Sequence, residues 1–105
     1  MELTMRQLRA LLSVTTNPAV SPVAAVRQIV IGERGWVWVG DVTRVGGDYI
    51  LSNASVIRVW GTTSGLGELA IKGKQTKTIL DPCGTVRVPE LAVIGRIDVA
   101  PGAIL

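Results

Sequence analysis

The pattern of hydrophobic and polar positions is most typical of a strand between residues 36 and 45, where Trp and Val dominate and Asp41, Thr43 and Arg44 are polar. Because successive side chains of a β-strand point to opposite faces, a strand here would divide these residues between two faces. One of its faces would carry Trp36, Trp38, Gly40, Val42 and Arg44. The segment Gly46-Gly47-Asp48 suits a tight hairpin turn, since glycine accepts the positive φ that such turns require. Residues 49–52 would then return as the antiparallel partner.

Further β-type segments flank this hairpin. Residues 24–31, 56–60, 85–88 and 91–99 are rich in Val and Ile, which favour strands. Residues 81–84, Asp-Pro-Cys-Gly, have the composition of a turn, and Pro89 indicates a break or an edge. The pattern predicts five or six short, mostly antiparallel strands.

Helical spacing occurs at two places. An apolar stripe in residues 2–13 predicts an amphipathic N-terminal helix, which we place within residues 1–16. That stripe consists of Met5, Leu8, Leu11 and Leu12. Residues 66–72 predict a short helix that packing must hold, with Ser64 as N-cap and Gly73 as its stop.

These elements predict one α+β domain over residues 1–105. It would consist of an N-terminal helix, a linker over 17–24 that contains Pro18 and Pro22, and a β-rich core over 25–99. The core would be a small antiparallel sheet with one short helix. The apolar tail, residues 100–105, is a candidate for docking on a neighbouring chain.

Composition changes this picture in one respect. Apolar residues make up 48% of the chain and charged residues only 18%, and the mean hydropathy is +0.42. A small domain has proportionally more surface to keep wet, so we expect apolar surface to be buried between subunits of a homo-oligomer. No apolar run approaches the roughly 20 residues of a membrane span, and no signal peptide is expected.

Charge and cysteine content limit the partners. The net charge of +3 is spread along the chain, so a specific or non-specific DNA-binding role is not expected. Mild basicity is compatible with an anionic small ligand. The single cysteine, Cys83, fits a reducing cytoplasm.

The absent residue types argue against catalysis. The chain has no histidine, the commonest general base and metal ligand, and its carboxylates and single cysteine show no zinc-binding spacing. We therefore expect no enzyme activity, no metal and no cofactor.

The candidate ligand site lies in residues 53–73. Arg58 offers a planar fork for phosphate oxygens, and Trp60 offers a stacking surface for a base. The flexible polar loop after them, with Thr62, Thr63 and Ser64, could supply hydroxyl and amide hydrogen bonds to ribose or phosphate. Arg27, which interrupts an apolar strand, is a further candidate.

Each of these residues also has a purely structural interpretation. An arginine on a sheet is often a solvated surface residue, and residues 61–65 could be a plain connector. The tryptophans Trp36 and Trp38 could belong to the core, to a subunit interface or to a stacking site. Arg87 and Arg96 could converge on the same pocket, although no pattern places them there.

Residues 53–73 resemble a family of short phage and prophage proteins. Their shared core runs Asn-Ala-x-x-Ile, then an aromatic segment with Trp, then Leu-x-x-Leu-Ala-x-x-Gly. It is matched here by Asn53, Ala54, Ile57, Trp60, Leu66, Leu69, Ala70 and Gly73. The likeness extends over residues 25–98 and depends mainly on small and apolar positions. This chain has Ser55, Val56 and Arg58 where the family tends to have a basic pair and an aromatic residue.

These phage proteins are in turn similar to viral sponges that inhibit Thoeris, CBASS or related nucleotide-signalling defences. The resemblance implies an anti-defence protein in the cytoplasm of an infected bacterial host. It would be a homo-oligomer that sequesters a cyclic ADP-ribose isomer or cyclic oligonucleotide without cleaving it. The alternative is a structural or interaction protein of a phage, such as a virion component or a direct protein inhibitor, with Trp36 and Trp38 and the tail as anchors.

Overall fold

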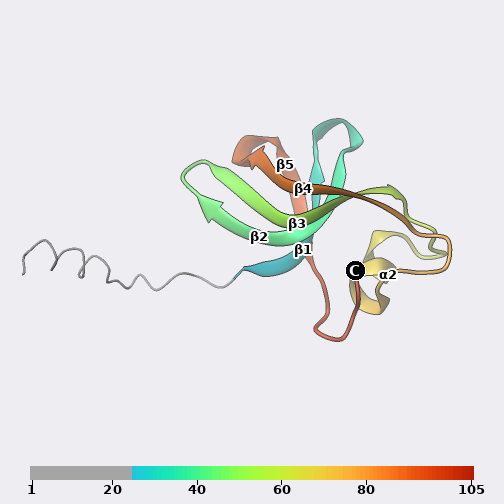
Figure 1. Cartoon of the computed structure of the whole chain (residues 1–105). Helices are drawn as coiled ribbons and strands as arrows, with labels where there is room; N and C mark the ends of the chain where they lie inside the picture. The colour runs from blue at the N-terminus through green and yellow to red at the C-terminus, as the bar shows by residue number, and fades with distance from the viewer. Residues whose placement is uncertain (1–24) are drawn as a thin grey trace, which may run out of the picture.

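The computed structural model describes residues 25–105, which form one curled antiparallel sheet with a short helix at one end (Figure 1). The helix, α2, spans Leu66–Lys72, and two 3₁₀ turns, η1 (Glu33–Gly35) and η2 (Glu90–Ala92), join strands. The strands are β1 (Val26–Gly32), β2 (Val37–Val45), β3 (Asp48–Val59), β4 (Ile79–Pro89) and β5 (Val93–Asp98).

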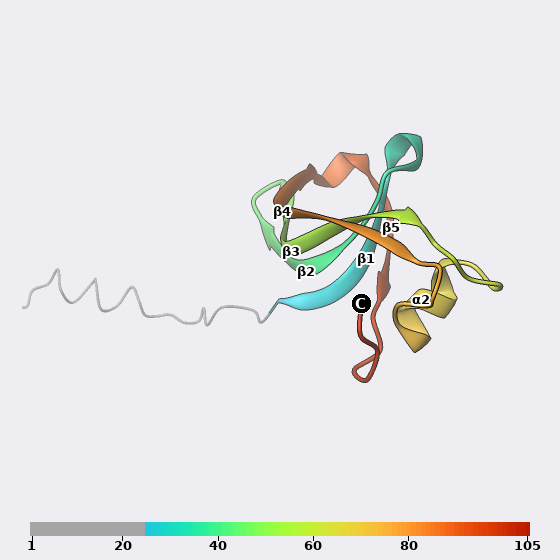
Figure 2. The same cartoon turned by 45° about the vertical axis from the view of Figure 1, so that its right-hand side comes forward.

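The strands run in the spatial order β4-β3-β2-β1-β5, with every pair antiparallel. β4 and β5 therefore lie at opposite edges, yet only the three residues of η2 separate them along the chain. So short a connection requires the sheet to curl until its two edges approach each other, as Figure 2 shows. A hydrogen bond from the Glu90 amide to the Gly47 carbonyl (2.8 Å) fixes η2 against the β2–β3 turn.

The α+β prediction is wrong. The part of the chain that the structure describes is mostly β, with 56% of its residues in strands and a single short α-helix. The predicted N-terminal helix (1–16) and linker (17–24) lie outside the described residues.

β3 is one continuous strand rather than the two short strands expected at 49–52 and 56–60. The strand passes through an irregularity where Asn53 takes a positive φ of 49°. Asparagine is among the few residues that tolerate this backbone region, so the chain bends here without leaving the sheet.

β4 likewise runs through residues 81–84, where a turn was expected. Pro82 lacks an amide hydrogen, but β4 is an edge strand and needs its hydrogen bonds on one side only. Gly84 takes a φ of 76°, which lets the strand bend at another irregularity in the ladder. The turn-like composition therefore marks a bent sheet edge.

Two hydrophobic clusters lie on opposite faces of the sheet, since the neighbouring residues Ile29 and Val30 of β1 belong to different clusters. The first cluster packs beneath α2 and consists of Ile29, Val37, Val39, Ile57, Leu69 and Ala70. The second lies inside the curl of the sheet and consists of Val30, Val42, Tyr49, Leu51, Ala54 and Val88.

The C-terminal segment packs on its own chain. The Ala100 amide donates to the Ala70 carbonyl at 2.7 Å, and the Lys74 amide donates to the Ile104 carbonyl at 2.8 Å. An added Cβ on Gly73 would come within 2.7 Å of the Ile104 backbone, so the tail lies directly against the end of α2. The tail is therefore held within the chain and is not a free segment for docking on a neighbour.

Candidate functional site

Arg58 lies near the end of β3 in a two-point ion pair with Asp81 of β4. Its Nε donates to Oδ2 at 2.7 Å and its second terminal nitrogen donates to Oδ1 at 3.4 Å. The side-chain hydrogen bond with Asp81, followed by the charge of that carboxylate, raises the pKa of Arg58 above its ordinary value. Both side chains remain accessible, with exposed fractions of 60% and 46%. Because an exposed ion pair contributes little to stability, an anionic ligand could replace Asp81 as the partner of Arg58.

Trp60 follows two residues later, at the point where the chain leaves the sheet. The residue is 43% exposed, so part of it is accessible to a ligand. Its backbone is fixed, because its carbonyl accepts a hydrogen bond from the Thr78 hydroxyl at 2.7 Å. Arg58 and Trp60 are thus both accessible side chains at the same strand end.

The loop 61–65 has internal hydrogen bonds that differ from the predicted arrangement. Thr62 donates from its hydroxyl to the Gly65 carbonyl at 2.9 Å. The N-cap of α2 is Gly65, so the assignment of Ser64 to that position is wrong. The amides of Thr63 (3.2 Å) and Ser64 (2.9 Å) both donate to Oε1 of Glu68, and so does the Thr63 hydroxyl (3.2 Å).

Glu68 is the third residue of α2 and reaches back over the helix start, as the Glu of a capping box does. The amides of the loop do favour an anion, but the carboxylate of Glu68 already occupies them. A phosphate would have to displace Glu68 to use the same donors. This loop is therefore better suited to shaping the site through its backbone than to binding phosphate through its amides.

The environment of Glu68 lowers its pKa. Burial acts to raise the pKa, but hydrogen bonds from Ser64 and Thr63 and the charge of Lys72 outweigh it. A carboxylate with a depressed folded-state pKa contributes stability at pH values above its unfolded pKa of about 4.3, and this stability is lost as pH falls through the folded-state pKa.

We expect the amide chemical shifts of Thr63 and Ser64 to titrate together, with a midpoint below the ordinary Glu pKa of about 4.3. Protonation of Glu68 removes the charged acceptor that these amides share. In Glu68→Gln the titration should disappear, whereas Glu33→Gln, in the distant η1 turn, should leave it unchanged. NMR spectra recorded from neutral pH to pH 2 measure this, and amide shifts independent of Glu68 would contradict the assigned contacts.

Arg27 lies elsewhere and ties several segments together. Its Nε and one terminal nitrogen donate to the main-chain oxygen of Leu105 at 3.2 and 2.8 Å. Its other terminal nitrogen donates to Oδ1 of Asp41 (3.3 Å) and to the carbonyl of Asn53 (3.0 Å). Arg27 thus contacts β3 at Asn53, five residues before Arg58. At roughly 3.3 Å per residue, the two arginines reach β3 at points about 16 Å apart.

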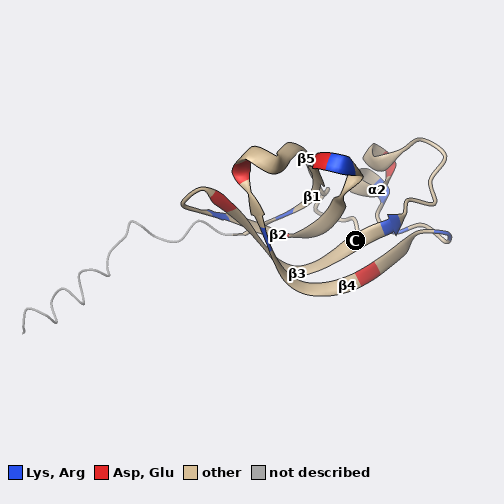
Figure 3. Cartoon of the chain, turned by 90° about the horizontal axis from the view of Figure 1, so that it is seen from above, with Lys and Arg blue, Asp and Glu red and all other residues tan. Residues whose placement is uncertain are grey.

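The arginines therefore do not converge. Arg87 pairs with Asp48 at 3.7 Å, and Arg96 contacts Gln28 on β1. Figure 3 shows the charged residues spread over several elements rather than gathered on one face. Of the candidate residues, Arg58, Trp60, Thr62, Thr63 and Ser64 follow one another closely along the chain, at the end of β3 and in the loop after it.

A hollow of about 340 Å³ lies beside this loop, and one of its lining residues, Lys72, is a positively charged side chain that the sequence analysis did not single out. It is lined by Ser64, Gly67, Glu68, Ile71 and Lys72. The spacing of four residues from Glu68 to Lys72 could have revealed it, because residues four apart in a helix share a face. Lys72 thus provides a second positive charge next to the loop.

No protein-family model matches the chain, and no curated protein matches it. Within residues 25–105, no group of three or more Cys, Asp and Glu side chains is arranged to hold a metal ion. The helix in that part of the chain is too short and insufficiently apolar to cross a membrane.

Proposed function

We propose that this protein binds and sequesters a phosphorylated nucleotide signal without cleaving it. The observation that carries the proposal is the pairing of an accessible guanidinium, Arg58, with a half-exposed indole, Trp60, at one strand end. A nucleotide presents an anion and an aromatic base, so it complements both side chains at once.

Binding would exchange one anion for another. Asp81 holds the Arg58 guanidinium in a fixed orientation, and a phosphate would take over its two hydrogen bonds. The base would stack on Trp60, a contact worth about 1–3 kcal/mol. Lys72, beside the loop, would add positive charge for a second phosphate.

A second copy of the chain would complete the site. The accessible residues lie on an open surface, and enclosed pockets bind small ligands more tightly than open surfaces do. Val59 and Ile79, which pair across β3 and β4, and Ile71 of α2 are exposed apolar residues. Contact between these residues in a homo-oligomer would cover them and enclose the ligand between subunits.

The resemblance to phage proteins and viral sponges supplies the biological setting of this proposal. The protein would act in the cytoplasm of an infected bacterium and would lower the free concentration of a cyclic ADP-ribose isomer or cyclic oligonucleotide. Sequestration needs only affinity and abundance, because the ligand is retained rather than converted.

We expect a thermal-shift panel of cyclic nucleotides to contain a stabilising ligand, with about 2.7 kcal/mol of stabilisation at a hundredfold excess over Kd. Heating the purified complex should release that ligand unchanged, as judged by chromatography against the input compound. Recovery of a cleaved product would contradict sequestration and indicate an enzyme.

The second candidate is a structural or interaction protein. Trp36 and Trp38 stack with ring centroids 5.7 Å apart, and Trp36 is 54% exposed. Leu91 (95%) and Ile94 (70%) are also exposed, and such side chains are typical anchors for a protein partner. This candidate predicts that no nucleotide stabilises the protein and that Trp36→Ala abolishes capture of a protein partner.

A further inference from the structure

Arg96 differs from the other arginines on the strands in having neutral partners. The others each form an ion pair with a carboxylate: Arg27 with Asp41, Arg44 with Glu90, Arg58 with Asp81 and Arg87 with Asp48. Arg96 donates to Oε1 of Gln28 at 3.0 Å, and its guanidinium carbon lies 4.8 Å from the centroid of the Tyr49 ring. Among the described residues, its charge is thus positioned by neutral groups and is not neutralised by an ion pair.

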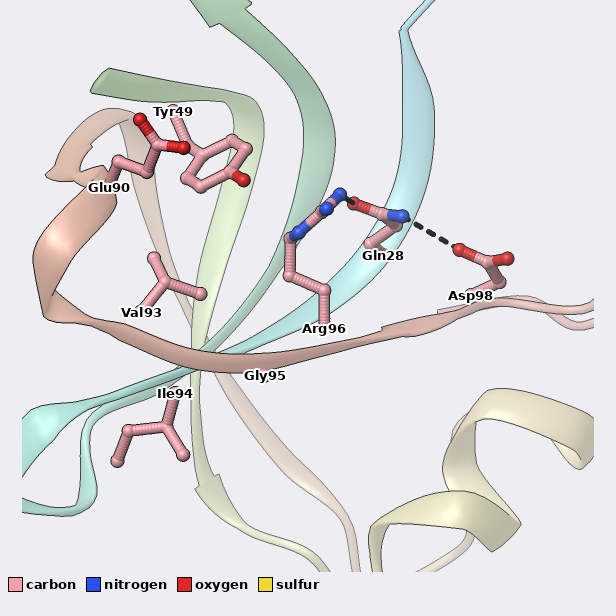
Figure 4. Close-up of a pocket in the computed structure, with 8 residues that line it drawn as sticks. All are labelled: Gln28, Tyr49, Glu90, Val93, Ile94, Gly95, Arg96 and Asp98. Carbon is pink, nitrogen blue, oxygen red and sulfur yellow. Dashed lines mark hydrogen bonds between the residues drawn. The ribbon is translucent and has the colours of Figure 1, made fainter. Parts of the chain in front are cut away.

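Arg96 lines an open hollow of about 610 Å³ beside β5 (Figure 4). Tyr49 of β3 and Glu90 of η2 close one end, and Asp98 lies at the other end. The volume falls within the range of about 300–1,000 Å³ that is usual for small-molecule sites. Arg58 and Trp60 are not part of this hollow, so it is distinct from the proposed nucleotide site.

Gln28 sets the order of donors and acceptors along the hollow. Its side chain is almost fully buried, with the residue 8% exposed. Its oxygen accepts from Arg96, and its Nε2 donates to Oδ1 of Asp98 at 2.7 Å. Arg96 and Asp98 are two residues apart on β5 and therefore share a face. The carboxamide thus has its acceptor end at the guanidinium and its donor end at the carboxylate.

A small zwitterion, like this carboxamide, places a hydrogen-bond acceptor and a hydrogen-bond donor side by side. In an α-amino acid, the carboxylate and the ammonium group are attached to one carbon, so an acceptor end and a donor end lie about as close together as in an amide. The guanidinium of Arg96 has five N–H donors, of which the contact with Gln28 uses one, so a carboxylate could bind at two points. The second oxygen of Asp98 could accept from the ammonium group.

We propose that the hollow beside β5 binds an α-amino acid or a closely related zwitterion, with its carboxylate on Arg96 and its ammonium group on Asp98. The carboxylates of Glu90 and Asp98 would repel a polyphosphate. Glu90 is already paired with Arg44, which leaves Asp98 as the acceptor for the ammonium group.

NMR titration of the ¹⁵N-labelled full chain with the standard L-amino acids tests this proposal. At least one should shift the Gln28 side-chain amide and the Arg96 Nε–H in a saturable way, with a Kd of about 1 mM or tighter. Its N-acetyl and methyl-ester derivatives, which lack one charge each, should bind at least tenfold more weakly. The indole N–H of Trp60 should not move, which separates this site from the nucleotide site.

Variants supply the second arm of the test. Arg96→Gln and Asp98→Asn should each weaken binding at least tenfold, whereas Arg87→Gln on β4 should leave it unchanged. Both changed residues are exposed, and thermal unfolding of each variant checks that it is folded. If Arg96→Gln does not fold, Asp98→Asn carries the test alone. Absence of saturable shifts with all the amino acids, or equal binding by the derivatives or by Asp98→Asn, would overturn the proposal.

Discussion

Gly61→Ala is expected to destabilise the protein by more than about 2 kcal/mol, from overpacking combined with backbone strain. Gly61 follows Trp60 with a φ of +67°, a region that side chains other than glycine disfavour. A Cβ there would lie 2.3 Å from the carbonyl carbon of Lys77 and 2.5 Å from the amide nitrogen of Thr78. These are backbone atoms, so the segment after α2 would have to move as a whole.

That movement would also break the hydrogen bond from the Thr78 hydroxyl to the Trp60 carbonyl. Thr78 is 4% exposed, so the loss would leave a buried polar group without its partner. Gly67→Ala is the matched control, since a Cβ at this position meets nothing and alanine favours helix by about 1 kcal/mol. Chemical denaturation measures both variants, and equal stability of the two would contradict the close approach at Gly61.

Leu69→Ala is expected to cost about 2–5 kcal/mol, the usual range for removing a buried leucine side chain. Leu69 is fully buried and joins α2 to Ile29, Val39 and Ile57 of the sheet. A helix of seven residues does not form alone, so this contact determines whether α2 stays on the sheet. The loop 61–65 would lose its order as well, because Glu68 is carried by the same helix.

Ile71→Ala on the same helix is the control for this prediction. Ile71 is 69% exposed in the single chain, so its truncation removes little surface buried within that chain and should change the unfolding free energy of the monomer by less than about 0.5 kcal/mol. Denaturant unfolding of both variants measures the difference, and NMR spectra report whether the amides of Thr63 and Ser64 stay fixed. Similar losses for the two variants would show that α2 does not pack through Leu69.

The strands were predictable where residues that favour β-structure are dense, as the Val and Trp residues are in 36–45, most of which form β2. Prediction was wrong where the chain bends without leaving the sheet, at Asn53 of β3 and at residues 81–84 of β4. Local composition indicates a bend at both places. Whether a bend ends a strand depends on the neighbouring strands, which are contributed by distant parts of the chain.

The candidate site was predictable in part for a similar reason. The sequence could place Arg58 near Trp60, because residues two apart at one strand end stay close together in any fold. The partner of Arg58, Asp81, and the tie between Arg27 and the main-chain oxygen of Leu105 are contacts between distant segments. The role of Glu68 depends on the path of the loop before α2, which composition does not determine.

The ion pair with Asp81 has a consequence for affinity. A phosphate must compete with this carboxylate for Arg58, so Asp81 lowers the affinity for any anion at the site. Asp81→Asn weakens the competitor while leaving a side chain of similar size. Under the proposed function, this variant binds the nucleotide more tightly than the wild-type protein does.

Isothermal titration calorimetry with the nucleotide that gives the largest thermal shift decides whether Arg58 and Trp60 form a receptor. The wild-type protein should bind saturably, Arg58→Gln at least tenfold more weakly, and Trp60→Ala more weakly by about 1–3 kcal/mol. Arg87→Gln, which removes an equal charge from β4, should bind as the wild type does. Equal affinities for all four proteins, or no binding of any nucleotide, would contradict the proposed function.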